Sequence, residues 1–375
     1  MRDIKQIALE LQPCIGNRSG IGMYAYEIAK HLRCDAAMSF CGNVFNFRGT
    51  EDLCKAMQGI DLPIRVCTKL PYGVYRRLWH TVPVSYEAFF ARVDLTVFFN
   101  FIVPPRIHGK AITTVHDLTY LRYPETMDWK NLRRIQKDIA YSLQRSNRIL
   151  TVSEFSKQEL CQLLHVPENK VSVVYNAPVL SSETTNAEQV LQKHGVSGPY
   201  ILYVGTLEPR KNLVRLIQAF AQLKKTERIP HKLVLAGGKG WNSEEIYAQA
   251  EKTADVLTIG YVSNAEKNAL YQNAELFAFP SLYEGFGIPP LEAMSLGCPV
   301  VCANAASLPE VVGDAAELIE PMEVDSIAEG MLHVLADEPY RTKLIQRGYV
   351  RAKKFNWDDS ANKLTQICRE VLEES

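Results

Sequence analysis

The sequence predicts an α/β protein built from two doubly wound domains, and three observations support this. At 375 residues the chain is longer than one ordinary hydrophobic core accommodates. Short apolar runs alternate with helical patterns in both halves, which is typical of buried parallel strands. Between the halves, residues 180–199 are polar and contain a Gly-Val-Ser-Gly-Pro cluster of turn-forming residues, which marks a domain boundary.

The first half carries a regular series of apolar runs. Residues 4–11 are expected to form the first strand, and 129–145 the clearest helix. Further strands are expected at 36–40, 64–67, 95–99, 112–115, 149–152 and 171–174. The glycine-containing loop 16–22, between the first strand and its helix, is suited to approach a phosphate, although it lacks the G-x-G-x-x-G spacing. A tight turn explains this loop equally well.

The second half repeats the alternation, beginning with a strand at 200–204. Its further strands are expected at 232–236, 256–259, 276–279, 299–302 and 316–319. A last helix is expected over 360–373. Ligands of doubly wound sheets bind at the carboxyl ends of the strands, so the loops after these strands are the expected place for chemistry.

Three helix starts carry capping signals. Asn212 is expected to cap the helix that follows it. Ser263 with Glu266, and Ser307 with Glu310, have the spacing of capping boxes.

Composition excludes several classes of protein. Lys plus Arg and Asp plus Glu both total 42, so no whole-protein electrostatic affinity for nucleic acid is expected. The nine cysteines are scattered without a C-x-x-C, which favours a reduced, cytoplasmic environment over a disulfide framework. No signal peptide is recognised, and the longest uncharged run, 293–309, contains glycine and proline and is not expected to span a membrane.

Residues 69–92 are basic and aromatic together. Arg76 and Arg77 stand close to Tyr72, Tyr75 and Trp79 in this stretch. Such a surface is suited to a membrane interface. It is equally suited to an acceptor pocket, or to a helix that packs on the first domain with its basic face in water.

The stretch 276–320 carries the strongest chemical signal. Glu284 and Glu292 stand as E-x(7)-E around a glycine loop that leads from a strand into a helix. Free backbone N–H groups at such a helix start attract anions. We expect Glu292 to lie one turn inside the helix, where a carboxylate accepts hydrogen bonds from sugar hydroxyls, and Glu284 to lie just before it. A buried strand, a turn and a helix cap is the plainer alternative.

Two other strand ends carry polar residues. Arg210 and Lys211 place two cations beside a helix start, which suits a diphosphate, although a solvated basic loop remains an alternative. His116 and Asp117 follow the strand expected at 112–115, and such a pair is often structural. No D-x-D pair, Walker motif, H-E-x-x-H or zinc-spaced cysteine cluster occurs, so no metal site is expected.

Taken together, these motifs resemble the retaining glycosyltransferases of family four. The matching stretches are SGIG at 19–22, TVHDLTYLRYPE at 114–125, LTVSEFSKQEL at 150–160, YVGTLEPRKN at 203–212, LAGGKGW at 235–241, IGYV at 259–262 and SLYEGFGIPPLEAMSLGCPVV at 281–301. The resemblance implies the GT-B architecture, in which two Rossmann-like domains face each other across a cleft. It implies an acceptor-side domain at 1–180, to which a helix at 358–375 crosses back, and a donor-binding domain at 181–357.

The resemblance also implies roles for single residues at the phosphate end of a nucleotide-sugar. Arg210 and Lys211 are expected to bind the diphosphate, near Gly205. The backbone N–H groups of Gly20 and Ile21 are expected to reach it from the first domain.

Roles at the sugar and base follow in the same way. Glu284 is expected to hold the transferred sugar, Glu292 the ribose, and Tyr261 and Val262 the base, while His116 lies near the leaving oxygen. The donor site is completed by the loop and helix residues Gly285, Phe286, Gly287 and Leu291.

The resemblance implies transfer of a sugar from a nucleoside diphosphate to a hydroxyl with retention of configuration. The stretches TVHDLTYLRYPE and LEPRKN resemble bacterial mannosyltransferases of surface polysaccharides, which favours GDP-mannose over a UDP-sugar as donor. No metal cofactor is expected, because D-x-D is missing and Arg210 and Lys211 are present. A glycan or lipid-linked acceptor at the inner membrane face is expected, with peripheral membrane contact through residues 69–92. A sugar-nucleotide epimerase and a catalytically inactive nucleotide-sugar-binding protein are the alternatives.

Overall fold

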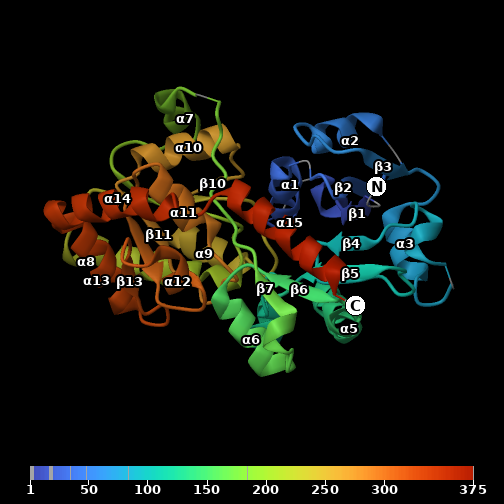
Figure 1. The fold of residues 1–375 in the computed structure, drawn as a ribbon. Helices are drawn as coiled ribbons and strands as arrows, with labels where there is room; N and C mark the ends of the chain where they lie inside the picture. The colour runs from blue at the N-terminus through green and yellow to red at the C-terminus, as the bar shows by residue number, and fades with distance from the viewer. Residues whose placement is uncertain are drawn as a thin grey trace. The chain divides into compact units, whose positions relative to one another are not determined.

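The computed structural model describes residues 4–16, 20–33, 35–47, 49–82, 84–183 and 185–374. The chain divides into two compact units. The first contains Met1–Leu118, Trp129–Asn176 and Trp357–Ser375, and the second contains Thr119–Asp128 and Ala177–Asn356. Figure 1 shows the elements of both units along the chain.

The first unit is built on a parallel sheet. In its described part the strand order is β3-β2-β1-β4-β5-β6-β7. The strands are β1 (Lys5–Glu10), β2 (Met38–Phe45), β3 (Ile64–Cys67), β4 (Leu95–Phe98), β5 (Lys110–Thr114), β6 (Arg148–Thr151) and β7 (Val171–Val173). Its helices are α1 (Gly20–His31), α2 (Thr50–Met57), α3 (Tyr72–Leu78), α5 (Trp129–Arg145), α6 (Glu154–Leu164) and α15 (Trp357–Glu373).

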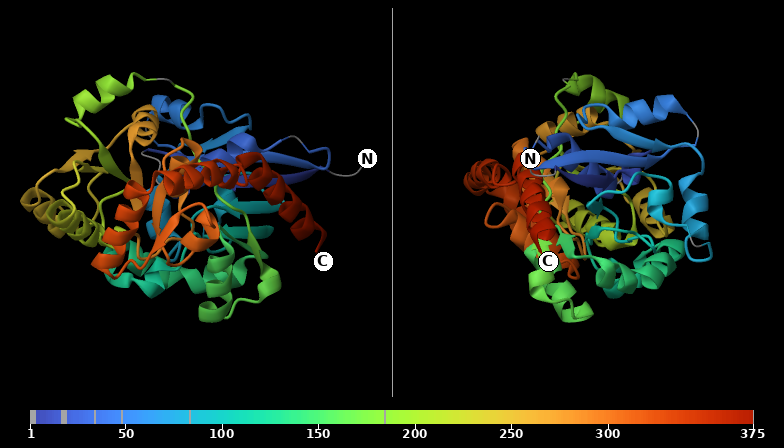
Figure 2. Two further views of the ribbon diagram at one scale, coloured as in Figure 1. Left: turned by 90° about the vertical axis from the view of Figure 1, so that its left-hand side faces the viewer. Right: turned by 45° about the vertical axis from the view of Figure 1, so that its right-hand side comes forward.

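The last helix, α15, packs beside α1 in the first unit (Figure 1). The Ser360 hydroxyl donates to the Tyr175 carbonyl at 2.8 Å, and Lys110 Nζ donates to the Val371 carbonyl at 2.7 Å. The C-terminal helix therefore belongs to the same unit as β1 and α1. Figure 2 shows the ribbon from two further sides.

The second unit has its own parallel sheet, with the order β10-β9-β8-β11-β12-β13 in the described residues. The strands are β8 (Tyr200–Val204), β9 (Lys232–Ala236), β10 (Val256–Gly260), β11 (Leu276–Phe279), β12 (Val300–Ala303) and β13 (Glu317–Ile319). The helices are α4 (Thr119–Arg122), α7 (Ala187–Lys193), α8 (Leu213–Thr226), α9 (Glu244–Lys252), α10 (Asn264–Asn273), α11 (Ile288–Ser295), α12 (Leu308–Val312), α13 (Val324–Ala336) and α14 (Glu338–Ala352).

In both sheets the strand order reverses direction beside the first strand of the unit. The reversal lies between β1 and β4 in the first sheet, and between β8 and β11 in the second. β8 and β11 are buried along their whole lengths, as strands of a sheet covered on both faces are. Loops that leave the carboxyl ends of two such neighbouring strands border a crevice, which is the usual place for a ligand.

The two units differ from the expected bounds, which were 1–180 with 358–375 and 181–357. Residues Thr119–Asp128 and residues 177–180 belong to the second unit, and Trp357 belongs to the first. The Trp241 ring nitrogen donates to the Thr126 carbonyl, and the Tyr123 ring lies 5.8 Å from the Tyr283 ring. These contacts join segments far apart in the sequence, so composition along the chain gave no sign of them.

The helix caps agree with the sequence in one case of three. The Ser263–Glu266 capping box is confirmed, with the Glu266 N–H donating to Ser263 Oγ and the Ser263 N–H donating to the Glu266 carboxylate. The Asn212 prediction is wrong, because Asn212 lies in the left-handed region at φ 61° and makes no side-chain cap. Its amide instead donates to the carbonyls of Pro280 and Pro321, at 3.1 and 2.6 Å. The Ser307 capping box is also wrong, because the Ser307 side chain makes no cap to α12.

The aromatic residues of the stretch 69–92 form part of the core of the first unit. Tyr75, Trp79, Tyr86 and Phe90 are buried in one cluster, with Phe45 at its centre. The basic residue Arg77 is exposed instead, beside Val74 and Leu78, which are 37% and 41% exposed. This part of the structure is therefore a helix that packs through its aromatic residues and leaves a mixed basic and apolar face outside.

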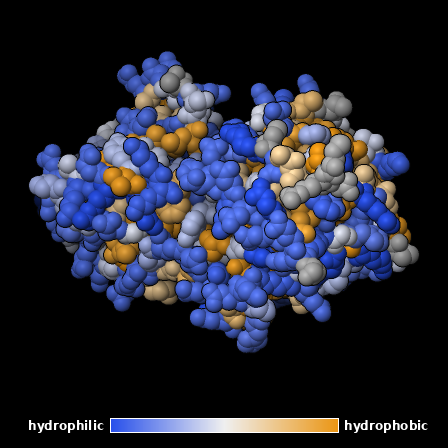
Figure 3. All heavy atoms as spheres, viewed as in Figure 1, coloured by the Kyte–Doolittle hydropathy of each residue, from blue (hydrophilic) through white to orange (hydrophobic). Residues whose placement is uncertain are grey.

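Figure 3 shows that hydrophilic residues dominate the face in view, with apolar residues interspersed among them. Among the described residues, no helix combines the length and the apolar composition that spanning a bilayer requires.

Candidate functional site

Two loops of the second unit meet beside the switch point of its sheet. The first leaves β8 and runs from Gly205 to Asn212 through a 3-10 turn, Pro209–Lys211. The second leaves β11 and runs from Pro280 to Gly287. The Leu282 N–H donates to the Arg210 carbonyl at 2.9 Å, which joins the two loops directly. Three of the residues predicted from sequence, Arg210, Lys211 and Glu284, are thereby brought together.

The side chains of these three residues form a compact ion-pair network. Lys211 Nζ lies 2.6 Å from Glu284 Oε1, and Arg210 Nη1 lies 2.8 Å from Glu284 Oε2. Arg210 Nη1 also donates to the Tyr283 carbonyl. Its other terminal nitrogen, Nη2, lies 2.8 Å from Glu208 Oε1. Each carboxylate oxygen of Glu284 thus accepts a charge-assisted hydrogen bond, the strongest kind available to it.

The network keeps a buried carboxylate ionised. Glu284 is 8% exposed, and burial on its own raises the pKa of a carboxyl group. The positive charges of Arg210 and Lys211, together with the hydrogen bonds that both donate, overcome this and hold the pKa of Glu284 at about 2. Glu284 is therefore a permanent anion and a pure hydrogen-bond acceptor at neutral pH.

The end of the second loop requires glycine. Gly287 has φ 111°, in the region that side chains rarely adopt. A Cβ atom there would lie 2.6 Å from Cδ2 of Leu308. Phe286, the residue before it, is 3% exposed, and its ring meets the Phe355 ring edge-on at 5.4 Å.

The start of α11 offers few backbone donors. Pro289 and Pro290 occupy its first turn, and proline carries no N–H group. The donors that remain at this helix start are those of Gly287 and Ile288. Leu291, also predicted to bind the donor, is fully buried within the helix.

Close backbone packing fixes the loop after β8. A Cβ atom on Gly237 would lie 1.8 Å from the Gly205 carbonyl oxygen, and one on Gly240 would lie 2.6 Å from the Leu207 carbonyl oxygen. The Leu207 N–H donates to the Gly238 carbonyl, and the Gly240 N–H donates to the Leu207 carbonyl, both at 3.0 Å. Glycine at 237 and 240 therefore allows this segment to pack directly against the backbone of the loop that contains the predicted residue Gly205.

Glu292 lies one turn inside α11, as predicted, but it already has a cationic partner. Its Oε1 lies 2.6 Å from Lys267 Nζ, and the Tyr271 hydroxyl donates to its Oε2 at 3.4 Å. Glu292 is 3% exposed, and burial raises its pKa above the ordinary value although Lys267 opposes the shift. The two residues predicted to line a base pocket follow β10, where Tyr261 is 83% exposed and Val262 is buried.

The remaining predicted residues belong to the first unit. Gly20 and Ile21 open α1, and His116 follows β5 by two residues. His116 Nε2 lies 2.8 Å from the Phe99 carbonyl, and its ring meets the Tyr24 ring edge-on at 5.2 Å. Burial lowers the pKa of His116, so its ring is neutral at pH 7 with the proton on Nε2 and a lone pair on Nδ1. Ser19 of the SGIG motif, with Asn17 and Arg18 of the same loop, lies outside the described residues.

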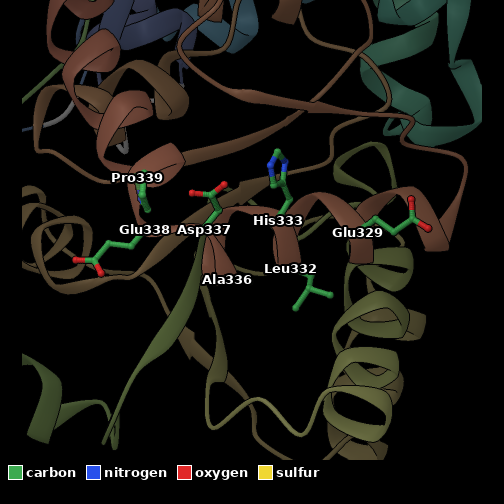
Figure 4. A pocket seen from close by; sticks show the side chains of 7 residues that line it. All are labelled: Glu329, Leu332, His333, Ala336, Asp337, Glu338 and Pro339. Carbon is green, nitrogen blue, oxygen red and sulfur yellow. The ribbon is translucent and has the colours of Figure 1, made fainter.

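A separate hollow of about 590 Å³ opens along α13 and the start of α14 (Figure 4). It is lined by Glu329, Leu332, His333, Ala336, Asp337, Glu338 and Pro339. Three carboxylates in this lining disfavour a phosphate-bearing ligand. None of the residues predicted for the donor site lies there. In the described part of the chain, no group of three or more histidine, cysteine or acidic side chains is arranged to hold a metal ion.

Sequence reasoning missed three residues of this site. Glu208 pairs with Arg210, Lys267 pairs with Glu292, and Ser307 contacts the loop after β11. Glu208 lies in the stretch YVGTLEPRKN, two residues before Arg210, so its charge beside Arg210 was a usable signal. Lys267 and Ser307 come from other elements, and only the tertiary fold brings them here.

Comparison with known proteins gives a consistent family. The family model described as Glycosyltransferase Family 4 matches residues 18–178, and the model described as Glycosyl transferases group 1 matches residues 186–351. The O-antigen chain mannosyltransferase B of Escherichia coli is 37% identical over 267 residues, which cover 69% of this chain and 70% of the relative. The serotype-specific mannosyltransferase WbdA of Escherichia coli is 28% identical over 277 residues, and the alignment spans only 34% of its length.

Solved structures agree at the level of the fold. Sucrose-phosphate synthase from Thermosynechococcus elongatus is similar with a TM-score of 0.74 and 19% identity, over 99% of this chain and 100% of that one. HepE of Anabaena, solved in complex with UDP and glucose, is similar with a TM-score of 0.73 and 20% identity, over 98% and 100%. Two parallel-sheet units with these neighbours correspond to an α/β protein of the GT-B fold.

Proposed function

The chain belongs to the family 4 glycosyltransferases, and we propose that it transfers mannose from GDP-mannose to a hydroxyl group of a glycan. The choice of mannose follows the relatives, whose names describe mannosyltransferases of O-antigen synthesis. The observation that carries the proposal is the network of Arg210, Lys211 and Glu284 at the switch point of the second sheet.

Arg210 and Lys211 form the phosphate end of the proposed site. Both cations lie at the Glu284 carboxylate, and we propose that they bind the diphosphate as well, so that they connect the phosphate end to the sugar end. Glu208, which is 2% exposed, pairs with the other terminal nitrogen of Arg210 and so fixes the position of the guanidinium group. In the transition state the negative charge on the leaving diphosphate grows, and fixed cations stabilise it without reorganisation.

Glu284 and the loop that follows it form the sugar end. A carboxylate whose pKa stays at about 2 accepts hydrogen bonds from sugar hydroxyls at any physiological pH. Glu292 is proposed to hold the ribose from within α11, and Tyr261 and Val262 to line the base. The roles expected of Gly20, Ile21 and His116 stay predictions.

The proposed chemistry follows from the residues available. The bond between the sugar and the diphosphate breaks through an oxocarbenium-like state, and the acceptor hydroxyl attacks. Glu284 is bound by two cations, which makes it a poor covalent nucleophile. We therefore favour retention by front-face attack, in which the leaving phosphate takes the acceptor proton. The two cations supply the positive charge that a metal would otherwise provide, so we propose that no metal is required.

The acceptor is proposed to be a glycan, carried on a lipid at the inner membrane face. The exposed face of α3, with Arg77 beside Val74 and Leu78, is the proposed membrane contact. A basic face interrupted by aliphatic side chains suits an anionic lipid surface.

A donor panel tests this function. The purified chain is incubated with GDP-mannose, UDP-glucose and UDP-N-acetylglucosamine, each with and without a mannose-terminated oligosaccharide on a hydrophobic aglycone. Mass spectrometry should detect one added hexose with GDP-mannose only when the acceptor is present. Transfer from a UDP-sugar alone would overturn the donor assignment, and conversion of a donor to its epimer without acceptor would indicate an epimerase. Binding without turnover of any donor would indicate an inactive nucleotide-sugar-binding protein.

A further inference from the structure

A single buried hydroxyl holds the loop after β11 in place. Ser307 is fully buried, and its Oγ lies 2.8 Å from the Glu284 carbonyl oxygen and 3.0 Å from the Phe286 carbonyl oxygen. Its spacing from Glu310 predicted a capping box at α12, but the structure places this hydroxyl on the loop of another element. Because one hydroxyl contacts both carbonyl oxygens, it restrains the positions of both carbonyl groups.

This arrangement sets the direction of the backbone donors. In a planar trans peptide the carbonyl of one residue and the N–H of the next point in opposite directions. Because the Phe286 carbonyl faces Ser307, the Gly287 N–H points away from Ser307. Ser307 also holds the Glu284 carbonyl. This hydrogen bond fixes the backbone of Glu284, whose carboxylate pairs with Arg210 and Lys211.

The Gly287 donor matters more here than at an ordinary helix start. Pro289 and Pro290 remove two of the backbone donors that usually open a helix. Another residue does not fit at Gly287, because its φ is 111° and a Cβ atom there would lie 2.6 Å from Leu308 Cδ2. Ser307 and Leu308 are adjacent, so the start of α12 supports the loop from one side with a hydrogen bond and an apolar contact.

We propose that Ser307 is a positioning residue that aims the Gly287 N–H group and the Glu284 carboxylate at the oxygens of the sugar in a bound nucleotide-sugar. The inference rests on the proposed function for the identity of the ligand. It assigns Ser307 no contact with the ligand. Ser307 fixes the position of the Gly287 N–H group relative to the Glu284 carboxylate, so that oxygens of the transferred sugar can hydrogen-bond to both groups at the same time.

The test compares two ligands that differ only in the sugar. Calorimetry with GDP-mannose and with GDP gives the contribution of the sugar to affinity in each variant, without any need for turnover. In Ser307→Ala the affinity for GDP-mannose should fall about tenfold, as for one lost positioned hydrogen bond, while the affinity for GDP stays within twofold. Ser307→Thr keeps the hydroxyl and should restore the difference. Ser307→Cys, of similar size with a weaker donor, should lie between them and serves if the alanine variant does not fold.

Ser146→Ala is the matched control. Ser146 is 2% exposed and its Oγ donates to the Ser142 carbonyl at 2.7 Å, in the first unit and outside the proposed site. It should lose some thermal stability without changing the ratio of the two affinities. If Ser307→Ala lowers only the melting temperature and leaves that ratio unchanged, Ser307 is structural and the proposal is overturned. If GDP-mannose binds wild type no better than GDP, the donor assignment fails first, and the same titrations with the nucleotide-sugar that wild type does bind decide the role of Ser307.

Discussion

At the scale of single residues, the site is built from charges that already have partners. Arg210 and Lys211 were predicted to bind a diphosphate, and in the structure they also pair with Glu284, at 2.8 and 2.6 Å. Under the proposed function the same two cations also face the diphosphate, so their positive charges are shared by a carboxylate and a diphosphate.

Glu10 of the first unit shows the opposite kind of carboxyl group. It is 6% exposed at the end of β1, and burial raises its pKa to about 8, although the Gln12 N–H opposes the shift. The folded protein therefore keeps Glu10 protonated over a range in which the unfolded chain ionises it. Stability from this group is complete below pH 4.5 and is lost as the pH rises toward about 8.

We predict that Glu10→Gln removes this pH dependence. The amide cannot ionise, so the variant should gain stability relative to wild type by up to about 1.4 kcal/mol for each pH unit above 4.5, levelling off near pH 8. Urea unfolding of both proteins at pH 5 and pH 8 measures the difference. The exposed residue Glu251 provides a control through Glu251→Gln. An unchanged difference between wild type and Glu10→Gln at the two pH values would contradict the burial argument.

The contacts of the candidate site were only partly predictable from the sequence. Glu284, Arg210 and Lys211 could be proposed for one site because their motifs stand next to recognisable strands and helix starts, and the structure brings these three together. Ser307 could not, because the contact that matters is with a loop about twenty residues earlier, and its local spacing favoured a cap. Local patterns report local bonds, whereas a fully buried hydroxyl bonds to whatever the fold places beside it.

At the scale of elements, buried strands were the most predictable part. Those expected at 200–204, 232–236 and 276–279 have these bounds in the structure, because continuous apolar runs define them. β2 was expected at 36–40 and instead runs from Met38 to Phe45. Gly42 and Asn43 interrupt its apolar pattern, but their backbones still pair with both neighbouring strands. The last helix begins at Trp357, three residues earlier than expected.

The stretch 69–92 divides into an inner and an outer face that the sequence alone left undecided. Trp79 is 3% exposed in the aromatic cluster, so Trp79→Ala should destabilise the fold by about 3–5 kcal/mol.

Arg77 is exposed, so Arg77→Ala should leave the melting temperature unchanged. If α3 contacts membrane, Arg77→Ala should also weaken sedimentation with vesicles that contain an anionic lipid, by roughly fivefold for a loss of about 1 kcal/mol. Equal sedimentation of Arg77→Ala and wild type would exclude Arg77 from a membrane contact.

At the scale of the whole molecule, alternation of strands and helices predicted two parallel sheets, and both are present. The switch point between β8 and β11 explains why motifs separated by about seventy residues meet, since the two strands are neighbours in the sheet. The assignment of Thr119–Asp128 to the second unit could not be predicted, because it depends on contacts of Trp241 and Tyr283 with that segment.

The charge balance of the proposed site leads to a prediction about metals. Two cations stand at the phosphate end and the sequence contains no D-x-D pair, so glycosyl transfer should continue in the presence of EDTA. Initial rates with and without chelator measure this. Complete loss of transfer with EDTA, restored by Mg²⁺ or Mn²⁺, would show that a metal has a role we have assigned to Arg210 and Lys211.

The central claim is that the phosphate and sugar ends of one donor site lie at Lys211 and Glu284, and calorimetry with free GDP beside initial rates with GDP-mannose tests it most directly. Lys211→Ala should weaken GDP roughly ten- to a hundredfold, as expected for a lost charge-assisted bond of about 1.5–3 kcal/mol, and should also slow transfer. Glu284→Gln should leave GDP affinity nearly unchanged or slightly tighter, because the product has no sugar, while transfer slows by on the order of a hundredfold. If Glu284→Gln remains folded and loses GDP affinity as severely as Lys211→Ala, the sugar does not lie at Glu284 and the account of the site is wrong.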